Sequence, residues 1–455
     1  MAEQNVQQQQ TVAEKKQQTA SVKTLEAALQ VLAKFGGFNV LESSVDGVQN
    51  LNPERKARRN IFLTDPERGK ERKELEKRLD MWLDMLKEGK PINEMVELCE
   101  KKSEAVSDLL IQNQLKAVEA VKPLEVSYRT VMLFFKNTDS DKIKNVTIMN
   151  ASKEQLTDLD NSIFIDAVAN ELRANYDRLD LRTNYSLLVI PGFLGSNKVI
   201  EKWAKIANEN KVMIFTDFAD LEKPDDVIEM FFASNLSGGD VYKSKVCMAC
   251  NYLVGRGRYA ELGETEDLLI PPSGALAGSV YKTLMSQVTA GKKYGALSEV
   301  DGVAFNLKKS EISAIEKMGL IPMVKEYGKV MAFSAKTLFN GDNLGLQTYS
   351  VVRVFDWIAK VLIDFLNRRA FENWSNKSER DLRGQITKFL DSIQGPDRLI
   401  EKFRILRFER DPKQKDRIFL DIHITPYFPA KSFVIKLDGT KGEDEAEWNT
   451  DLKQE

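Results

Sequence analysis

The sequence predicts a mixed α/β (α+β) protein with a helical N-terminal region and β-strands close to the C-terminus. Three observations support this fold class. Apolar residues recur at helical spacing across much of residues 21–122. Strand and helix patterns alternate through the middle of the chain, which is typical of parallel βαβ units. The stretch 402–437 then shows three strand patterns separated by turns that contain proline or polar residues.

Composition limits the classes of protein that the chain can belong to. At 455 residues with 42% apolar content, it is long enough for two or three domains with buried cores. Its 66 basic and 68 acidic residues nearly cancel, so no overall field favours nucleic acid or an anionic membrane. The start is polar rather than a signal peptide, and we find no apolar run of membrane-spanning length. Three cysteines, an odd number, indicate a reducing cytoplasm.

The chain contains one histidine, His423, and it lies in the terminal strand segment. Most general-base, triad and zinc chemistry uses histidine. We therefore expect no enzyme activity, no metal and no cofactor.

The N-terminal region begins with a Gln-rich lead over 1–20 that is too polar to fold. An amphipathic helix is predicted next, over 22–35, and Gly36 and Gly37 end it. Its apolar face consists of Val22, Leu25, Leu29, Leu32 and Phe35. This helix either docks on its own domain or is offered to another protein. The charged stretch 53–78 mixes both signs, which favours a solvated helix face over a nucleic-acid patch.

Residues 123–400 are predicted to form the α/β core. The expected strands are 130–136, 145–149, 186–190, 211–216, 246–253, 302–306 and 330–334, and the expected helices are 163–176, 198–209, 273–285, 311–318, 349–374 and 379–394. The helix 349–374 has the strongest pattern, with one apolar face. Its opposite face carries Arg353, Asp356, Lys360, Asp364 and Arg368.

Three motifs could carry chemistry, and each has a plainer interpretation. The loop after Ile190, Pro191-Gly192-Phe193-Leu194-Gly195-Ser196, lacks both a nucleophile elbow and the spacing of a phosphate-binding loop. Cys247 and Cys250 lie in a predicted strand, pointing to opposite faces, so buried thiols are favoured over zinc or redox chemistry. In Pro271-Pro272-Ser273-Gly274-Ala275-Leu276-Ala277-Gly278, Ser273 can cap a helix and the small residues allow close packing. The alternative function is an α/β hydrolase that uses Ser196 or Ser273 with His423.

The terminal strands over 401–437 have no obvious element to lie against. A sheet of two or three strands keeps two unpaired edges, which invite strand addition from another chain. The expected contact residues are Phe403, Ile405, Phe408, Ile418, Leu420, Ile422, Ile424, Phe433, Ile435 and Leu437. The acidic tail, 438–455, is predicted to be a solvated end or a short helix around Trp448. These features predict an assembly protein.

Several segments together resemble one family. Ile270 to Gly278 is similar to the P-P-S-G-A loop of the large subunit of the type VI secretion contractile sheath, the TssC/VipB family. Glu316 to Pro322, leading to Ala332–Leu338, resembles that family's Leu-Ile-Pro and F-S-A stretch, and Val352 to Val361 resembles one of its helices. Pro123-Leu124-Glu125 and Asn150 to Lys153 are similar to segments near its front. The resemblance runs from about Ile111 to Leu437.

This resemblance implies a sheath-like core and a structural role. The C-terminal strands would interlock with a small sheath subunit (TssB/VipA-like), and copies of the heterodimer would form a sheath around an inner tube (Hcp-like) on a baseplate. Contraction would propel the tube. An AAA+ unfoldase (ClpV-like) would recycle the sheath through a helix near Leu25, Leu29, Leu32 and Phe35. The implied location is the bacterial cytoplasm, with the sheath anchored through the baseplate to the envelope.

Overall fold

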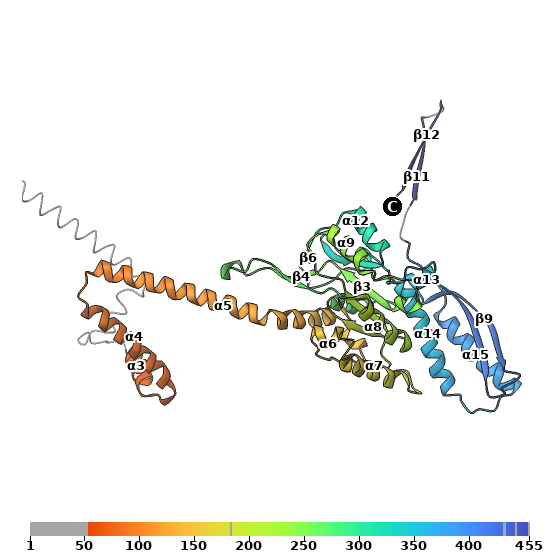
Figure 1. Ribbon diagram of the computed structural model, residues 1–455, viewed down its shortest axis with the longest axis horizontal. Coiled ribbons are helices and arrows are strands. Elements are labelled where there is room, and N and C mark those ends of the chain that lie inside the picture. Colours follow the sequence, from red (N-terminus) through yellow and green to blue (C-terminus); the bar gives the residue numbers. More distant parts are fainter. Residues whose placement is uncertain (1–52, 183, 431–433, 442–443, 454–455) are drawn as a thin grey trace, which may run out of the picture. The chain divides into compact units, whose positions relative to one another are not determined.

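The computed structural model describes residues 53–182, 184–430, 434–441 and 444–453 (Figure 1). The chain divides into two compact units, one ending at Ala117 and the other beginning at Val118. The predicted helix at 22–35 lies outside the described residues.

The first unit is helical. It contains α3 (Pro53–Thr64), the short 3-10 helix η1 (Pro66–Arg68), α4 (Gly69–Lys87) and the first part of α5 (Ile92–Asn137). Asp65 caps η1, because its Oδ1 accepts a hydrogen bond from the Glu67 amide at 3.0 Å. Arg72 Nη1 donates to the carbonyls of Phe62 and Asp65, which ties α4 to the end of α3.

A five-stranded sheet organises the second unit, in the order β1-β2-β3-β7-β8. Its strands are β1 (Leu187–Ile190), β2 (Met213–Asp217), β3 (Val246–Cys250), β7 (Leu320–Glu326) and β8 (Lys329–Ala332). The first four are mutually parallel, and β8 pairs antiparallel with β7. Helix α8 (Asn197–Glu209) connects β1 to β2. The predicted βαβ organisation and the mixed fold class are therefore confirmed.

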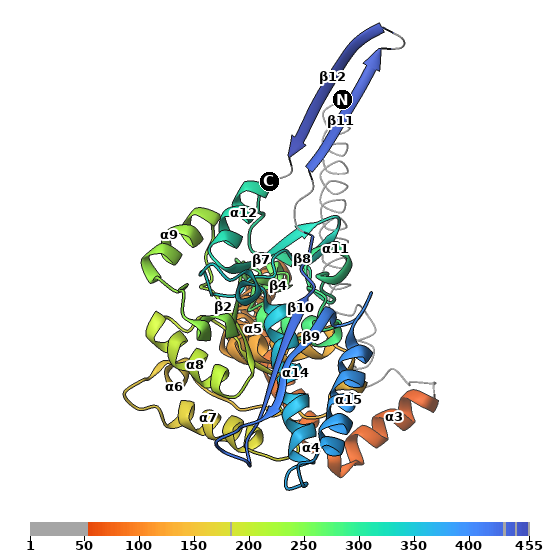
Figure 2. The same ribbon diagram turned by 90° about the vertical axis from the view of Figure 1, so that its right-hand side faces the viewer.

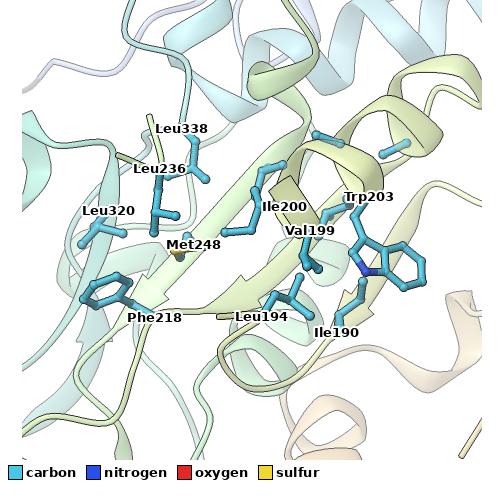
Figure 3. Close-up of a cluster of buried hydrophobic side chains, with 14 of the residues drawn as sticks. Ile190, Leu194, Val199, Ile200, Trp203, Phe218, Leu236, Met248, Leu320 and Leu338 are labelled. Atoms are coloured by element: carbon cyan, nitrogen blue, oxygen red, sulfur yellow. The ribbon is translucent and has the colours of Figure 1, made fainter. Parts of the chain in front are cut away.

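Helices cover both faces of this sheet, which is why β2 and β3 are buried along their whole length. One face packs against α8 with α7 (Ile163–Tyr176), α9 (Pro224–Ser234) and α12 (Lys309–Lys317). Figure 3 shows part of this cluster, including Ile200, Trp203, Phe218 and Met248. The other face packs against the end of α5, α10 (Ser273–Lys282) and α14 (Tyr349–Asn367).

Two predicted strands are wrong. Residues 130–136 continue α5, although Val, Met, Leu and Phe residues there also suit a strand. Helix α10 packs closely on this helical stretch, because two of its glycines lie against this part of α5. A Cβ at Gly274 would be 2.6 Å from the Thr130 carbonyl oxygen, and one at Gly278 would be 2.3 Å from that of Phe134. The predicted close packing of the small residues is thus confirmed. Residues 145–149 contain no strand.

The predicted strand at 246–253 is divided in two. Asn251 has a positive φ of 71°, and its side-chain amide donates to the carbonyls of Phe305 and Met323, so β3 ends there. The chain continues as β4 (Leu253–Arg256), which lies between β5 (Leu268–Ile270) and β6 (Gly302–Val303) in a second sheet. Short elements fill the remaining connections: η2 (Ser140–Lys142), α6 (Lys153–Thr157), η3 (Val241–Lys245), η4 (Ala260–Leu262), α11 (Gly291–Tyr294) and α13 (Leu344–Gln347).

The C-terminal part forms two antiparallel pairs. After α14 and α15 (Asn376–Ile393) come β9 (Ile400–Arg410) and β10 (Ile418–Pro426), which pair with each other (Figure 2). β11 (Val434–Lys441) pairs with β12 (Asp444–Lys453). Of the two alternatives for the tail, the helix around Trp448 is wrong, because Trp448 lies in β12, opposite Gly439.

Candidate functional site

The β9–β10 pair lies against α14 and α15, so the prediction that the terminal strands have nothing to lie against is wrong (Figure 2). Ile400 and Phe408 are buried in one cluster with Val354 and Ile358 of α14 and with the apolar face of α15. Five of the predicted contact residues are half-buried against that same cluster: Phe403, Ile405, Leu420, Ile422 and Ile424. These side chains therefore stabilise their own subunit.

A β-bulge decides which residues of β9 face inward. In the register, Leu420 is opposite Phe408 and Ile422 is opposite Ile405, which leaves Leu406 as the extra residue. Without it, Ile405 and Phe408 would point to opposite faces, because side chains alternate along a strand. The bulge puts both of them against the helices and leaves Leu406 61% exposed.

The outer side of this pair remains available to another chain. Among the described residues, neither β9 nor β10 pairs with a third strand, so each keeps one unpaired backbone edge. Ile418, one of the predicted contact residues, shares the face of Leu420 but is 42% exposed near the turn. Leu406 is a further exposed apolar residue of this pair. The sequence pattern did not indicate it, because alternation alone cannot locate a bulge.

The β11–β12 pair offers two more edges. Its backbone register sets Ile435 opposite Leu452 and Leu437 opposite Thr450. Within the described chain it is a sheet of two strands only. Phe433 lies outside the described residues, as do Leu25, Leu29, Leu32 and Phe35.

The helical first unit exposes a large apolar surface that the sequence reading did not assign to a site. On α4, Leu79, Met81, Trp82, Leu83 and Leu86 are all more than half exposed. Val106, Leu109 and Leu110 on α5 are similarly exposed. The sequence shows the helical periodicity of these apolar positions. Periodicity alone does not tell whether they pack against their own chain or against another protein. An apolar surface of this kind indicates a protein-binding face.

The residues of the hydrolase alternative have structural roles instead. Ser196 Oγ caps α8 by accepting from the Val199 amide. The prediction that Ser273 caps α10 is wrong: its Oγ instead donates to Asp217 Oδ2 at 2.6 Å. His423 is exposed on β10, and no hydrogen bond in the described part of the chain joins it to either serine.

Asp217 is the most unusual carboxyl in the core. It ends β2, is fully buried, and accepts from the Gly192 amide at 2.8 Å and from the Ser273 amide at 2.7 Å. Burial raises its pKa to about 7, although these hydrogen bonds favour the ionised form. Asp217 thus ties the loop after β1 to the start of α10, and it does so without contact with solvent.

The two cysteines of β3 fit the prediction of buried thiols. Cys247 packs in the cluster on one face of the sheet and Cys250 in the cluster on the other. Burial raises both thiol pKa values well above their ordinary range, which keeps them protonated. The described residues contain no group of three or more His, Cys, Asp or Glu side chains that could hold a metal ion. No helix in the described ranges is both long and apolar enough to cross a membrane.

Comparison with family models covers nearly the whole chain. Residues 116–340 match "Type VI secretion system TssC/VipB, central domain". Residues 348–454 match "TssC/VipB-like, C-terminal domain", and residues 25–114 match "TssC/VipB-like, N-terminal region". These matches define the class of protein: the chain is a component of the type VI secretion system. The chain belongs to the TssC/VipB family and is a structural subunit of the sheath.

Solved structures with detectable similarity include sheath and baseplate structures. The contracted helical sheath of the anti-feeding prophage is 15% identical, with 68% of this chain and 80% of that chain covered and a TM-score of 0.47. The sheath tail protein of Desulfitobacterium hafniense is 12% identical, with 65% and 60% covered and a TM-score of 0.39. At this level the likeness carries no argument about function. No curated protein matches the chain.

Proposed function

We propose that this sheath subunit pairs with a small sheath subunit (TssB/VipA-like) and polymerises around an inner tube (Hcp-like), which sheath contraction propels. The observation that carries the proposal is the pair of two-stranded sheets near the C-terminus of a TssC/VipB chain, each with unpaired edges. An isolated two-stranded sheet is marginally stable in water, and strand addition would complete it.

The two pairs are suited to different tasks. β9–β10 is anchored on α14 and α15 by its apolar face, so it can serve as the fixed part of an inter-subunit sheet. β11–β12 follows after Pro426 and Pro429 and is a separate sheet within the described chain. Strands added along these edges would join subunits through backbone hydrogen bonds, which persist while the helical cores repack.

The remaining partners follow from family membership and from the exposed helices. The apolar side chains of α4 and α5 are a surface for the small sheath subunit. The baseplate would anchor the sheath to the envelope from the cytoplasm. The helix predicted at 22–35 is assigned to an AAA+ unfoldase (ClpV-like) that recycles contracted sheaths.

Removing β11–β12 tests the strand-exchange role. Deletion of residues 434–453 spares β9–β10 and the core that they cover. Coexpressed with the small subunit, the truncated chain should fold, with an unchanged circular dichroism melting transition, yet form no sheaths by electron microscopy. Normal sheaths from the truncated chain would overturn the proposal. The full chain coexpressed in parallel is the control.

A further inference from the structure

Three of the five residues on the polar face of α14 are buried rather than solvated. Arg353, Lys360 and Asp364 are each only 8% exposed. Together with Asp356 they line a cavity of about 260 Å³, which also contacts Ser186 and Lys211 at the amino ends of β1 and β2. A water molecule occupies about 30 Å³ of liquid, so the cavity has room for a small polyatomic ligand.

The two acidic residues of this cavity already have partners. Asp356 pairs with Lys245, and Asp364 pairs with Arg368 and accepts from the Leu181 amide. Lys360 Nζ donates to two uncharged oxygens, Asn184 Oδ1 at 2.6 Å and the Tyr185 carbonyl at 2.8 Å.

Of the five cations that line the cavity, Arg182 pairs with Asp180, and the other four form no ion pair among the described residues. The guanidinium of Arg353 donates to the Val280 carbonyl at 3.2 Å. Across the described part of the chain, no carboxylate forms an ion pair with Arg353, Lys360, Lys211 or Lys144, all of which line the cavity.

Cations without counter-charges are costly in this setting. A buried charge is stable only when it is paired or well hydrogen-bonded. Burial lowers the pKa of Arg353, and burial also lowers that of Lys360 to about 8, with Lys245 and Lys211 adding to the effect and Asp356 opposing it. A bound anion would supply the missing negative charge.

We propose that this cavity binds a compact oxyanion, a phosphate or carboxylate group, held by Arg353 and Lys360. The planar fork of a guanidinium suits two oxygens of one such group, and the ammonium adds a point charge. Lys211 and Lys144, which are less buried, add positive potential. The site is independent of the strand-exchange role. The anion is either free in solution or a side chain of a neighbouring chain.

Calorimetric titration of the full-length chain with inorganic phosphate, at constant ionic strength set with chloride, tests the site. Lys360→Met should weaken phosphate binding by about tenfold, the loss of one charge-assisted hydrogen bond. Lys211→Gln should weaken it several-fold without disturbing the fold, because Lys211 is half-buried and makes no ion pair among the described residues. Lys388→Gln, at an exposed position of α15 outside the cavity, is the matched control and should bind as the wild type does.

A second titration distinguishes the two sources of the anion. The probe is a blocked tetra-aspartate peptide. Phosphate binding that exceeds peptide binding, and that depends on Lys360 and Lys211, indicates a free anion. Peptide binding that exceeds phosphate binding, and that depends on Lys360 and Lys211, indicates a carboxylate from a neighbouring chain. Absence of binding by both probes, or binding that Lys360→Met and Lys211→Gln leave unchanged, would refute the site.

Discussion

At the scale of single residues, the contact between α10 and α5 depends on two glycines. Gly278→Ala places a methyl group 2.3 Å from the Phe134 carbonyl oxygen, which is backbone and cannot rotate away. We expect the free energy of unfolding to fall by about 1–3 kcal/mol through overpacking. Urea denaturation followed by circular dichroism measures this.

The matched control for that substitution is Gly384→Ala in α15. A Cβ at Gly384 meets nothing within 4 Å. Alanine there should raise stability by up to about 1 kcal/mol, because it is the better helix former. Equal effects at both positions would contradict the close-packing argument.

Asp217 provides a prediction about pH. Its folded pKa of about 7 lies above the ordinary 3.8, so its protonated form stabilises the fold fully below about pH 4. That contribution is lost as the pH rises through 7. Asp217→Asn cannot titrate, and it removes the acceptor for the Gly192 amide, so it should destabilise by about 1–3 kcal/mol. The loss should be larger at pH 4 than at pH 8, and a loss that grows with pH would contradict the assignment.

At the scale of elements, we expect some residues of β9 and β10 to contribute to folding and others to sheath assembly. Ile422→Ala, which uncovers the core shared with α15, should lower the free energy of unfolding by about 2 kcal/mol. Leu406→Lys, at the exposed bulge position, should change it by no more than about 0.5 kcal/mol. We nevertheless expect Leu406→Lys to reduce sheath yield when the chain is coexpressed with the small subunit. Sheath yield equal to the wild type would exclude a contact at Leu406.

The elements also show where sequence reasoning works. The helix at 163–176 was predicted with the bounds that α7 has, because its apolar residues repeat at helical spacing and a polar stretch precedes it. The sequence predicts a strand over 130–136, where a short apolar run suits either structure. The helix that forms there packs on Gly274 and Gly278, which lie more than a hundred residues further along the chain.

At the scale of the whole molecule, the role that we propose for residues 22–35 in recycling the sheath can be tested. The double substitution Leu25→Asp and Leu29→Asp puts charges on the predicted apolar face, which an unfoldase groove would have to bury. Sheaths should assemble in normal number, while their disassembly by the AAA+ unfoldase with ATP should slow severely. Light scattering follows the disassembly. Disassembly at the wild-type rate would remove the recognition role from this helix.

The sequence by itself determined the mixed fold class, the βαβ core, the buried thiols and, through motif order, the sheath family. These depend on local periodicity and residue type, which the chain displays directly. Only the tertiary structure showed that the terminal strands are covered by their own helices, that a bulge turns Leu406 outward, and that the cations of α14 are buried around a cavity. Each of these depends on which distant segments meet, and no local pattern records that.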